Sequence, residues 1–396
     1  MGDHHPEDHH MPGSQWAVVH AVHIDSFWID IYEVTNEDYC EYLNSAYEQG
    51  LIEVTDGVVY KADDTAAYFC TSDAPPREIG QFQRIHWDGE TFTITEDKEN
   101  HPVARVSWFG AAAFANWKSA MNDLPECYNM ETWVCDFDAG GFRLPTEAEW
   151  EKASRGGHHD PYYMYPWGSN HTNNNEGNFL GSGDPYERET IPTTPVGYYE
   201  AQNDYGLYDI VGNVWEWCYD YWDLDYPSES PYDNPTGPDK GTIHVNKGGG
   251  FHSRPTVNSR NASRCNGCHF PNDPGSGNTA GYNIGFRLAS STDPEAQGVD
   301  EGRSDVLPGE FRIDSVYPNP FNSTTVISVS LPVSSELKLS VYNITGQEIA
   351  IIGNGRFYAG SNQFTFDASG LANGVYFVKA SVDGKMNAVR KIVLMK

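Results

Sequence analysis

The stretch Tyr205–Trp217, which reads YGLYDIVGNVWEW, constrains the fold of this chain more than any other. It combines aromatic anchors with Asp209, Gly212, Asn213 and Glu216, a composition that suits neither a plain strand nor a plain helix. Because Gly and Asn tolerate unusual backbone angles, we expect the chain to bend at Gly212 and Asn213. The aromatic side chains on both sides would anchor that bend in a core.

The two acids of this stretch allow two interpretations. Asp209 and Glu216, with the carbonyl groups between them, could surround a calcium ion, which takes about six to eight oxygen ligands. In the other interpretation, the two carboxylates only accept hydrogen bonds from loop amides. The residues by themselves leave both open.

Capping residues mark three helix starts. Thr35, Ser107 and Thr146 each precede a helical apolar pattern and can accept a hydrogen bond from the first turn. The pattern after Thr35 predicts a helix over about residues 36–47, and Thr146 opens a capping box. Alternating apolar residues over 17–33 predict strands.

Four segments resemble, in the same order, the formylglycine-generating enzyme family, also known as the sulfatase-modifying factor domain. They are GFRLPTEAEWE at 141–151, YPWG at 165–168, GLYDIVGNVWEW at 206–217, and the closing pair KGG at 247–249 with IGFRLA at 284–289. One such motif would be weak, but four in order are specific. The resemblance implies an α+β domain over residues 1–292 with a loop-rich, elaborated C-type-lectin-like fold.

Two structural calcium ions are also implied by this resemblance. Each would be held by side-chain and carbonyl oxygens, as a hard cation requires. The first set of ligands is Asn178, Phe179, Asp184 and Tyr186, with Phe179 and Tyr186 acting through carbonyls. The second set is Asp209, Gly212, Val214 and Glu216, with Gly212 and Val214 acting through carbonyls.

The catalytic centre departs from the family pattern. The family's oxidases bind copper(I) through two cysteines that follow the Gly-Gly turn, and copper(I) demands soft thiolate ligands. Residues 249–260 hold no cysteine, and Ser253 and Asn258 occupy the equivalent places. We therefore expect a binding or structural module that uses the old cleft for an unknown peptide, glycan or small molecule. The candidate cleft residues are His252, Ser253, Arg254, Asn258 and Arg260.

The nearest cysteines, Cys265 and Cys268, allow three interpretations. A small disulfide loop is the expected one for an exported protein, and Cys127 with Cys135 is spaced for a second local bridge. A displaced copper site would instead make the chain a formylglycine-generating oxidase that converts a sulfatase cysteine. The letters CNGCH also match the c-type haem attachment motif. Whether the chain is an enzyme therefore stays open at this point.

The charge of the chain is divided unevenly. The net charge is −31, and residues 311–396, with five acidic and eight basic residues, carry +3, so residues 1–310 carry −34. Such an acidic chain is a poor partner for nucleic acid or anionic membranes, and it has no apolar run long enough for a transmembrane segment. The shift in charge predicts two modules joined by a polar linker over residues 293–310.

The tail over residues 311–396 has short alternating strands separated by turn signals, which predict an all-β, immunoglobulin-like sandwich. Its segments YPNPFN at 317–322, VYNITG at 341–346 and LANGVYF at 371–377 resemble the C-terminal sorting domain of the type IX secretion system. The resemblance implies that residues 311–396 engage the type IX secretion machinery. It also implies transit through the periplasm to the cell surface or the medium. No signal peptide is visible, so we expect the natural chain to start upstream of Met1.

Overall fold

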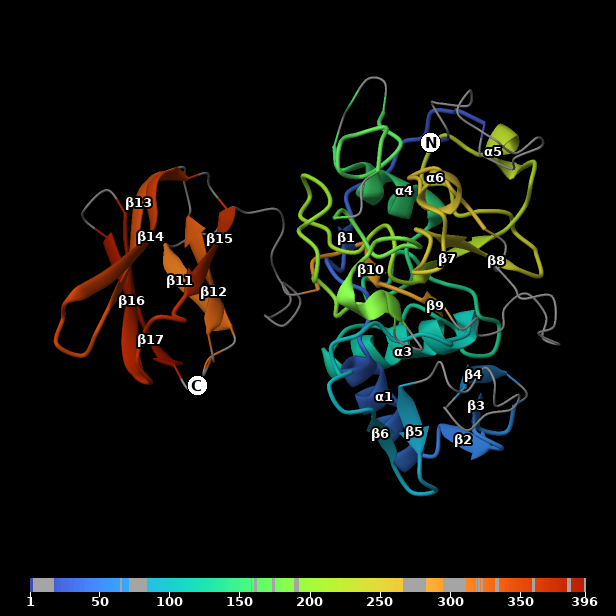
Figure 1. Ribbon diagram of the computed structural model, residues 1–396, viewed down its shortest axis with the longest axis horizontal. Helices are drawn as coiled ribbons and strands as arrows, with labels where there is room; N and C mark the ends of the chain where they lie inside the picture. Colours follow the sequence, from blue (N-terminus) through green and yellow to red (C-terminus); the bar gives the residue numbers. More distant parts are fainter. Residues whose placement is uncertain are drawn as a thin grey trace. The chain divides into compact units, whose positions relative to one another are not determined.

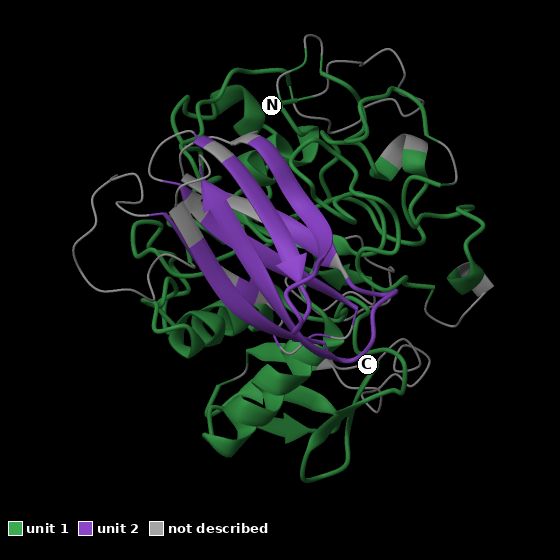
Figure 2. Ribbon diagram, turned by 90° about the vertical axis from the view of Figure 1, so that its left-hand side faces the viewer, with its two compact units in different colours: residues 1–299 green, residues 300–396 purple. Residues whose placement is uncertain are grey.

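The computed structural model describes residues 1–2, 18–64, 66–70, 84–157, 159, 162–172, 175–188, 192–265, 283–294, 311–317, 319, 321, 323–331, 335–357, 360–382 and 386–394. The chain divides into two compact units, residues 1–299 and 300–396 (Figure 2). Each unit buries a hydrophobic core of its own, and each is therefore described by itself.

The described residues of unit 1 contain three helices of more than two turns, and all three begin at the predicted caps. They are α1 (Asn36–Glu48), α3 (Trp108–Met121) and α4 (Glu147–Arg155). The hydroxyl groups of Thr35, Ser107 and Thr146 each accept a hydrogen bond from a backbone N–H in the first turn, at 3.0–3.2 Å. Local capping chemistry was therefore sufficient to place these helices.

The strands in the described part of unit 1 are short and form four small sheets. One sheet pairs β1 (Trp28–Ile29) with β10 (Ala289–Ser290), and a second pairs β5 (Ile85–Trp87) with β6 (Phe92–Ile94). A third contains β2 (Ile52–Thr55), β3 (Val58–Lys61) and β4 (Ala67–Cys70). The fourth has the order β8–β7–β9, with β7 (Trp215–Tyr221), β8 (His244–Lys247) and a parallel partner β9 (Ile284–Gly285). Three short helical elements are also described: η2 (Pro185–Arg188), α5 (Tyr226–Glu229) and α6 (Pro255–Asn258).

The prediction of strands over residues 17–33 was wrong for most of that stretch. Within its described part only β1 is a strand. The neighbouring amides bond to irregular segments: His23 N–H donates to the Tyr232 carbonyl and Asp30 N–H to the Leu288 carbonyl. This stretch is therefore mostly not paired with a neighbouring strand, and its alternation of apolar residues did not indicate a sheet.

The core of unit 1 is built from aromatic side chains between α1, α3 and the β8–β7–β9 sheet. Trp108 donates its indole N–H to the Cys218 carbonyl at 3.0 Å, and Trp217 donates to the Val106 carbonyl at 2.9 Å. Figure 1 shows α1 and α3 beside each other at one end of the unit. These two bonds between segments about a hundred residues apart fix β7 against α3, and β7 carries the site described below.

Unit 2 is a β-sandwich, in agreement with the prediction. One antiparallel sheet contains β11 (Arg312–Tyr317), β12 (Thr324–Leu331) and β15 (Gly360–Asp367). The other has the order β14 (Glu348–Phe357), β13 (Ser335–Tyr342), β16 (Gly374–Val382) and β17 (Met386–Leu394). Their inner faces share one buried core that includes Val329, Phe366, Leu339, Val378 and Ile392. Among the described residues of both units, no helix is long and apolar enough to cross a membrane.

Candidate functional site

The predicted bend at Gly212 and Asn213 is present and precedes β7 directly. Asp209, Gly212 and Asn213 have φ angles of 50°, 100° and 55°. A Cβ atom at position 212 would lie 2.6 Å from the carbonyl oxygen of Asn178, so only glycine fits there. The bend therefore presses the second predicted calcium set against a member of the first.

Asn213 holds the bend in place through its side chain. Its Oδ1 accepts from the Thr194 N–H at 3.0 Å, and its amide donates to Glu33 Oε2 at 2.7 Å. Glu33 in turn accepts from the Val214 N–H through Oε1 at 3.1 Å. Glu33, which sequence reasoning did not select, is thus a central support of this site.

Glu216, predicted as a calcium ligand, is occupied by protein partners. The Arg287 guanidinium donates to both of its oxygens at 2.8 Å, and the Trp150 indole donates to Oε2 at 2.7 Å. All three side chains are fully buried. Because both oxygens already accept from strong donors, Glu216 does not fit as a calcium ligand in this arrangement.

The surroundings of Arg287 hold more acid than base. Glu33, Asp209 and Glu216 are buried around this one guanidinium, and Asp30 beside them is partly buried. Burial raises the pKa of Asp30 and of Asp209 to about 6, and burial followed by repulsion from Asp209 and Glu216 raises the pKa of Glu33 well above its ordinary value. A cation or a proton at this place would relieve the repulsion.

Asp209 is a predicted ligand with one carboxylate oxygen that no described residue satisfies. Its Oδ2 accepts from the Gly197 N–H at 2.6 Å. Its Oδ1 is buried and has no hydrogen-bond partner among the described residues. A buried carboxylate oxygen without a donor is costly unless something positive meets it.

Members of the first predicted set already have protein hydrogen-bond partners. Asn178 lies against the bend and donates its amide to the Pro192 carbonyl at 2.6 Å. Asp184 accepts from the Tyr186 N–H at 2.8 Å, and from the hydroxyl groups of Ser182 at 2.5 Å and Tyr199 at 3.1 Å. The Phe179 carbonyl accepts from the Ser182 N–H. These oxygens serve a closed turn, which does not favour a cation there.

Among the described residues, no three His, Cys, Asp or Glu side chains gather in a group that could hold a metal ion. A calcium site at the bend would therefore have to use backbone carbonyl oxygens in addition to the Asp209 carboxylate.

A second buried ionic network connects α4 to β8. Lys247 Nζ lies 3.5 Å from Glu147 and 3.4 Å from Glu151, while Arg264 pairs with Glu147 and Arg155 with Glu151, both at 2.8 Å. Burial alone would raise the pKa of Glu151, but Arg155 and Lys247 lower it to about 2. In this network each carboxylate has two cationic partners, unlike the acids around Arg287.

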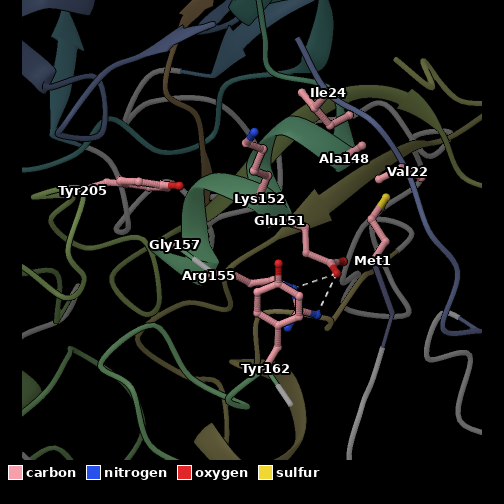
Figure 3. A pocket seen from close by; sticks show the side chains of 10 residues that line it. All are labelled: Met1, Val22, Ile24, Ala148, Glu151, Lys152, Arg155, Gly157, Tyr162 and Tyr205. Carbon is pink, nitrogen blue, oxygen red and sulfur yellow. Dashed lines mark hydrogen bonds and ion pairs between the residues drawn. The ribbon is translucent and has the colours of Figure 1, made fainter. Parts of the chain in front are cut away.

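A cavity of about 300 Å³ opens beside α4. Figure 3 shows Glu151 and Arg155 directed toward each other, with Tyr162 in front of them. The predicted cleft residues are not among its lining side chains. The cavity and the loop over residues 249–260 are therefore separate features.

Asp220 allows a test of the buried charges by pH. Burial and the nearby Glu147 raise its pKa to about 8, and its Oδ2 accepts from the Glu147 N–H at 2.7 Å. The folded chain thus keeps a proton that the unfolded chain releases. The free energy of unfolding should then fall by up to about 1.4 kcal/mol per pH unit between about pH 4 and pH 8.

Asp220→Asn, which imitates the protonated acid, should remove that part of the slope. Urea unfolding at several pH values would measure it, because all eleven tryptophans precede residue 293 and their fluorescence reports unit 1. A variant with the slope of the unmodified protein would contradict the prediction.

The loop over residues 249–260 presents two of the five predicted cleft residues to solvent. His252 and Arg254 are exposed, Asn258 ends α6, and Ser253 and Arg260 are buried. The Ser253 hydroxyl accepts from the Gly250 N–H at 2.9 Å, which ties it into a local turn.

The cysteines agree only in part with the expectations. Cys265 is disulfide-bonded, whereas Cys268 lies outside the described residues. Cys127 and Cys135 are free and buried, so the bridge expected between them is absent. A hydrogen bond from Cys135 lowers the pKa of Cys127, which shows that the two thiols meet without being joined. Cys218 is a buried free thiol, as predicted.

Comparison with known proteins identifies both units. Residues 1–292 match the model of the sulfatase-modifying factor enzyme 1-like domain, and residues 315–395 match the secretion system C-terminal sorting domain.

Three relatives illustrate the match. The chain is 33% identical over 306 residues to the formylglycine-generating enzyme of Thermomonospora curvata, covering 72% of this chain and 86% of that protein. It is 35% identical over 211 residues to the inactive C-alpha-formylglycine-generating enzyme 2 of Bos taurus, covering 50% and 61%. Among solved structures, Treponema denticola variable protein 1 covers 68% of this chain and 86% of its own, at 24% identity and a TM-score of 0.44.

Proposed function

The chain belongs to the sulfatase-modifying factor enzyme 1-like family, and from this premise we propose that its family domain is a ligand-binding or structural module and not an oxidase. The C-terminal sorting domain makes the protein a secreted or cell-surface protein. The module would therefore work outside the cell.

The loop over residues 249–260 carries this proposal. It has no cysteine. Ser253 stands where the resemblance puts a copper cysteine, and its hydroxyl accepts a hydrogen bond from a backbone amide. Cys265 is bound in a disulfide, so it offers no thiolate for copper(I). The Bos taurus relative is named inactive, which is a precedent for the domain without the activity.

The same loop suggests the chemistry of the ligand. The Tyr165 hydroxyl donates to the Pro255 carbonyl at 3.2 Å, and the Tyr165 ring stacks on Trp167 with centroids 4.9 Å apart. Beside this support lie His252 and Arg254, two exposed side chains that carry hydrogen-bond donors. We expect a peptide, glycan or small molecule that carries carboxylate or hydroxyl groups.

A copper titration with a peptide assay tests the proposal. The protein should bind no stoichiometric copper(I) and should leave a Cys-x-Pro-x-Arg peptide unmodified in the presence of oxygen, as judged by mass spectrometry. The Thermomonospora curvata enzyme is the positive control. Stoichiometric copper and an aldehyde on the peptide, both lost in Cys265→Ser, would instead establish an oxidase with a displaced Cys265/Cys268 site.

Calcium at the bend is the second part of the proposal. The unpartnered Asp209 Oδ1 and the surplus of acids around Arg287 support a cation held by Asp209 with the carbonyls of Gly212 and Val214. The ion would supply positive charge where Asp209 and Glu33 repel each other.

Calcium should raise the thermal midpoint of unit 1 relative to a chelator, because a ligand at about 100 times its Kd adds roughly 2.7 kcal/mol. Asp209→Ala should abolish this response, while Asp184→Ala, from the satisfied first set, should keep it. Differential scanning fluorimetry would measure both variants. A response lost only in Asp184→Ala would move the site to the first set.

A further inference from the structure

The hairpin between β13 and β14 in unit 2 holds an apolar residue rigidly in solvent. Asn343 Oδ1 accepts from the Thr345 N–H, the Thr345 hydroxyl and the Gln347 N–H at 2.7–3.0 Å, which fixes the turn. Within this fixed turn Ile344 is 75% exposed. An exposed isoleucine adds nothing to the core, and it is informative only where other exposed apolar side chains border it.

Ile344 borders a hollow of about 410 Å³. Its other sides are formed by Tyr342 on β13, Phe377 and Lys379 on β16, and Val389 on β17. Tyr342 pairs with Phe377 across the sheet, and Lys379 pairs with Val389, so these residues form adjacent rows. Val389 is 61% exposed, so two aliphatic side chains, those of Ile344 and Val389, are exposed at the rim of the hollow.

The hollow lies on the outer face of its sheet. Side chains alternate between the two faces of a strand. Val341 and Val378 are buried in the core between the sheets, so Tyr342, Phe377 and Lys379 face the opposite way. The hollow is thus not a defect of the core and is open to a partner.

The charge around the hollow indicates the kind of partner. Lys379 lies within it, and Lys391 is the cross-strand neighbour of Phe377. Glu348, which accepts from the Tyr342 hydroxyl at 2.9 Å, is itself paired with Lys338 at 2.8 Å. A partner that presents an apolar side chain between carboxylates would match both the apolar rim and the lysines.

We infer that this hollow is the surface by which a protein of the secretion machinery recognises the sorting domain, through an apolar side chain bordered by acidic residues. The inference rests on the assignment of residues 315–395 as a sorting domain and adds to it the recognition surface.

Export from a type IX-secreting bacterium tests the inference, with the full chain placed behind a host signal peptide. Ile344→Asp combined with Val389→Asp should lower the amount in the medium and on the surface by at least about tenfold, with the protein retained in the periplasm. Ile351→Asp is the matched control: Ile351 is 52% exposed on β14 of the same sheet and does not line the hollow. That control should be exported normally.

Lys379→Glu and Lys379→Arg test the charge separately and are less exposed to folding artefacts. The first should reduce export and the second should preserve it, with equal thermal midpoints. Normal export of Lys379→Glu and of the double variant would overturn the inference. Equal impairment of export by Ile351→Asp would also overturn it. So would variants that are exported normally but no longer self-associate in sedimentation, because the hollow would then bind a second copy of the chain. Retention of the unmodified chain in the periplasm would contradict both its assignment as an exported protein and this inference.

Discussion

Replacing Arg287 with Met should lower the free energy of unfolding of unit 1 by about 3–5 kcal/mol, because removing one partner of a buried ion pair leaves the other charge, here Glu216, buried without compensation. Arg287 donates to both oxygens of Glu216 at 2.8 Å, and to the carbonyls of Asp30 and Tyr208 at 2.9 Å. Without it, the carboxylates of Glu216 and Glu33 would remain buried in mutual repulsion.

Urea unfolding followed by tryptophan fluorescence would measure the loss. Adding Glu216→Gln to Arg287→Met should recover part of it, since the second change removes the charge that the first left unpaired. Arg287→Lys should lie between, because lysine keeps the charge but cannot form the two parallel bonds. A loss below about 1 kcal/mol in Arg287→Met would show that the pair is not needed.

Replacing Trp150 with Ala is expected to cost about 3–5 kcal/mol, the usual range for a buried tryptophan. The side chain is fully buried, donates to Glu216 at 2.7 Å, and has Lys247 Nζ 5.5 Å from its ring centroid. It therefore joins the site around Arg287 to the Lys247 network, and its loss would open a cavity between them.

Two controls separate the contributions of Trp150. Trp150→Phe keeps most of the volume but removes the donor to Glu216, so we expect a smaller loss of about 1–3 kcal/mol. Trp28, which is 53% exposed, is the matched control for composition, and Trp28→Ala should change stability by no more than about 0.5 kcal/mol. Equal losses in Trp150→Ala and Trp28→Ala by the same urea assay would refute the assigned role.

Sequence reasoning predicted the bend at the candidate site but not the partners of its buried side chains. The bend at Gly212 and Asn213 was predictable, because the tolerance of these residues for positive φ is a local property. Glu216 was expected to bind an ion, whereas in the structure it accepts from Arg287 and Trp150. No residue near Glu216 in the sequence indicates that Arg287 or Trp150 donates to it. The available signal was indirect: Arg287 lies within the apolar segment IGFRLA, where a charge needs a partner.

The sequence by itself determined the features that depend on neighbours in the chain. The caps at Thr35, Ser107 and Thr146 needed only their own first turns, and the strands of unit 2 followed from alternation and turn residues. Only the tertiary structure decided which buried charges meet. Glu33 reaches the Val214 amide across 181 positions, and Arg287 reaches Glu216 across 71. Burial removes water from both groups of such a pair, and each is then costly unless it meets the other. No local sequence pattern indicates which groups will meet.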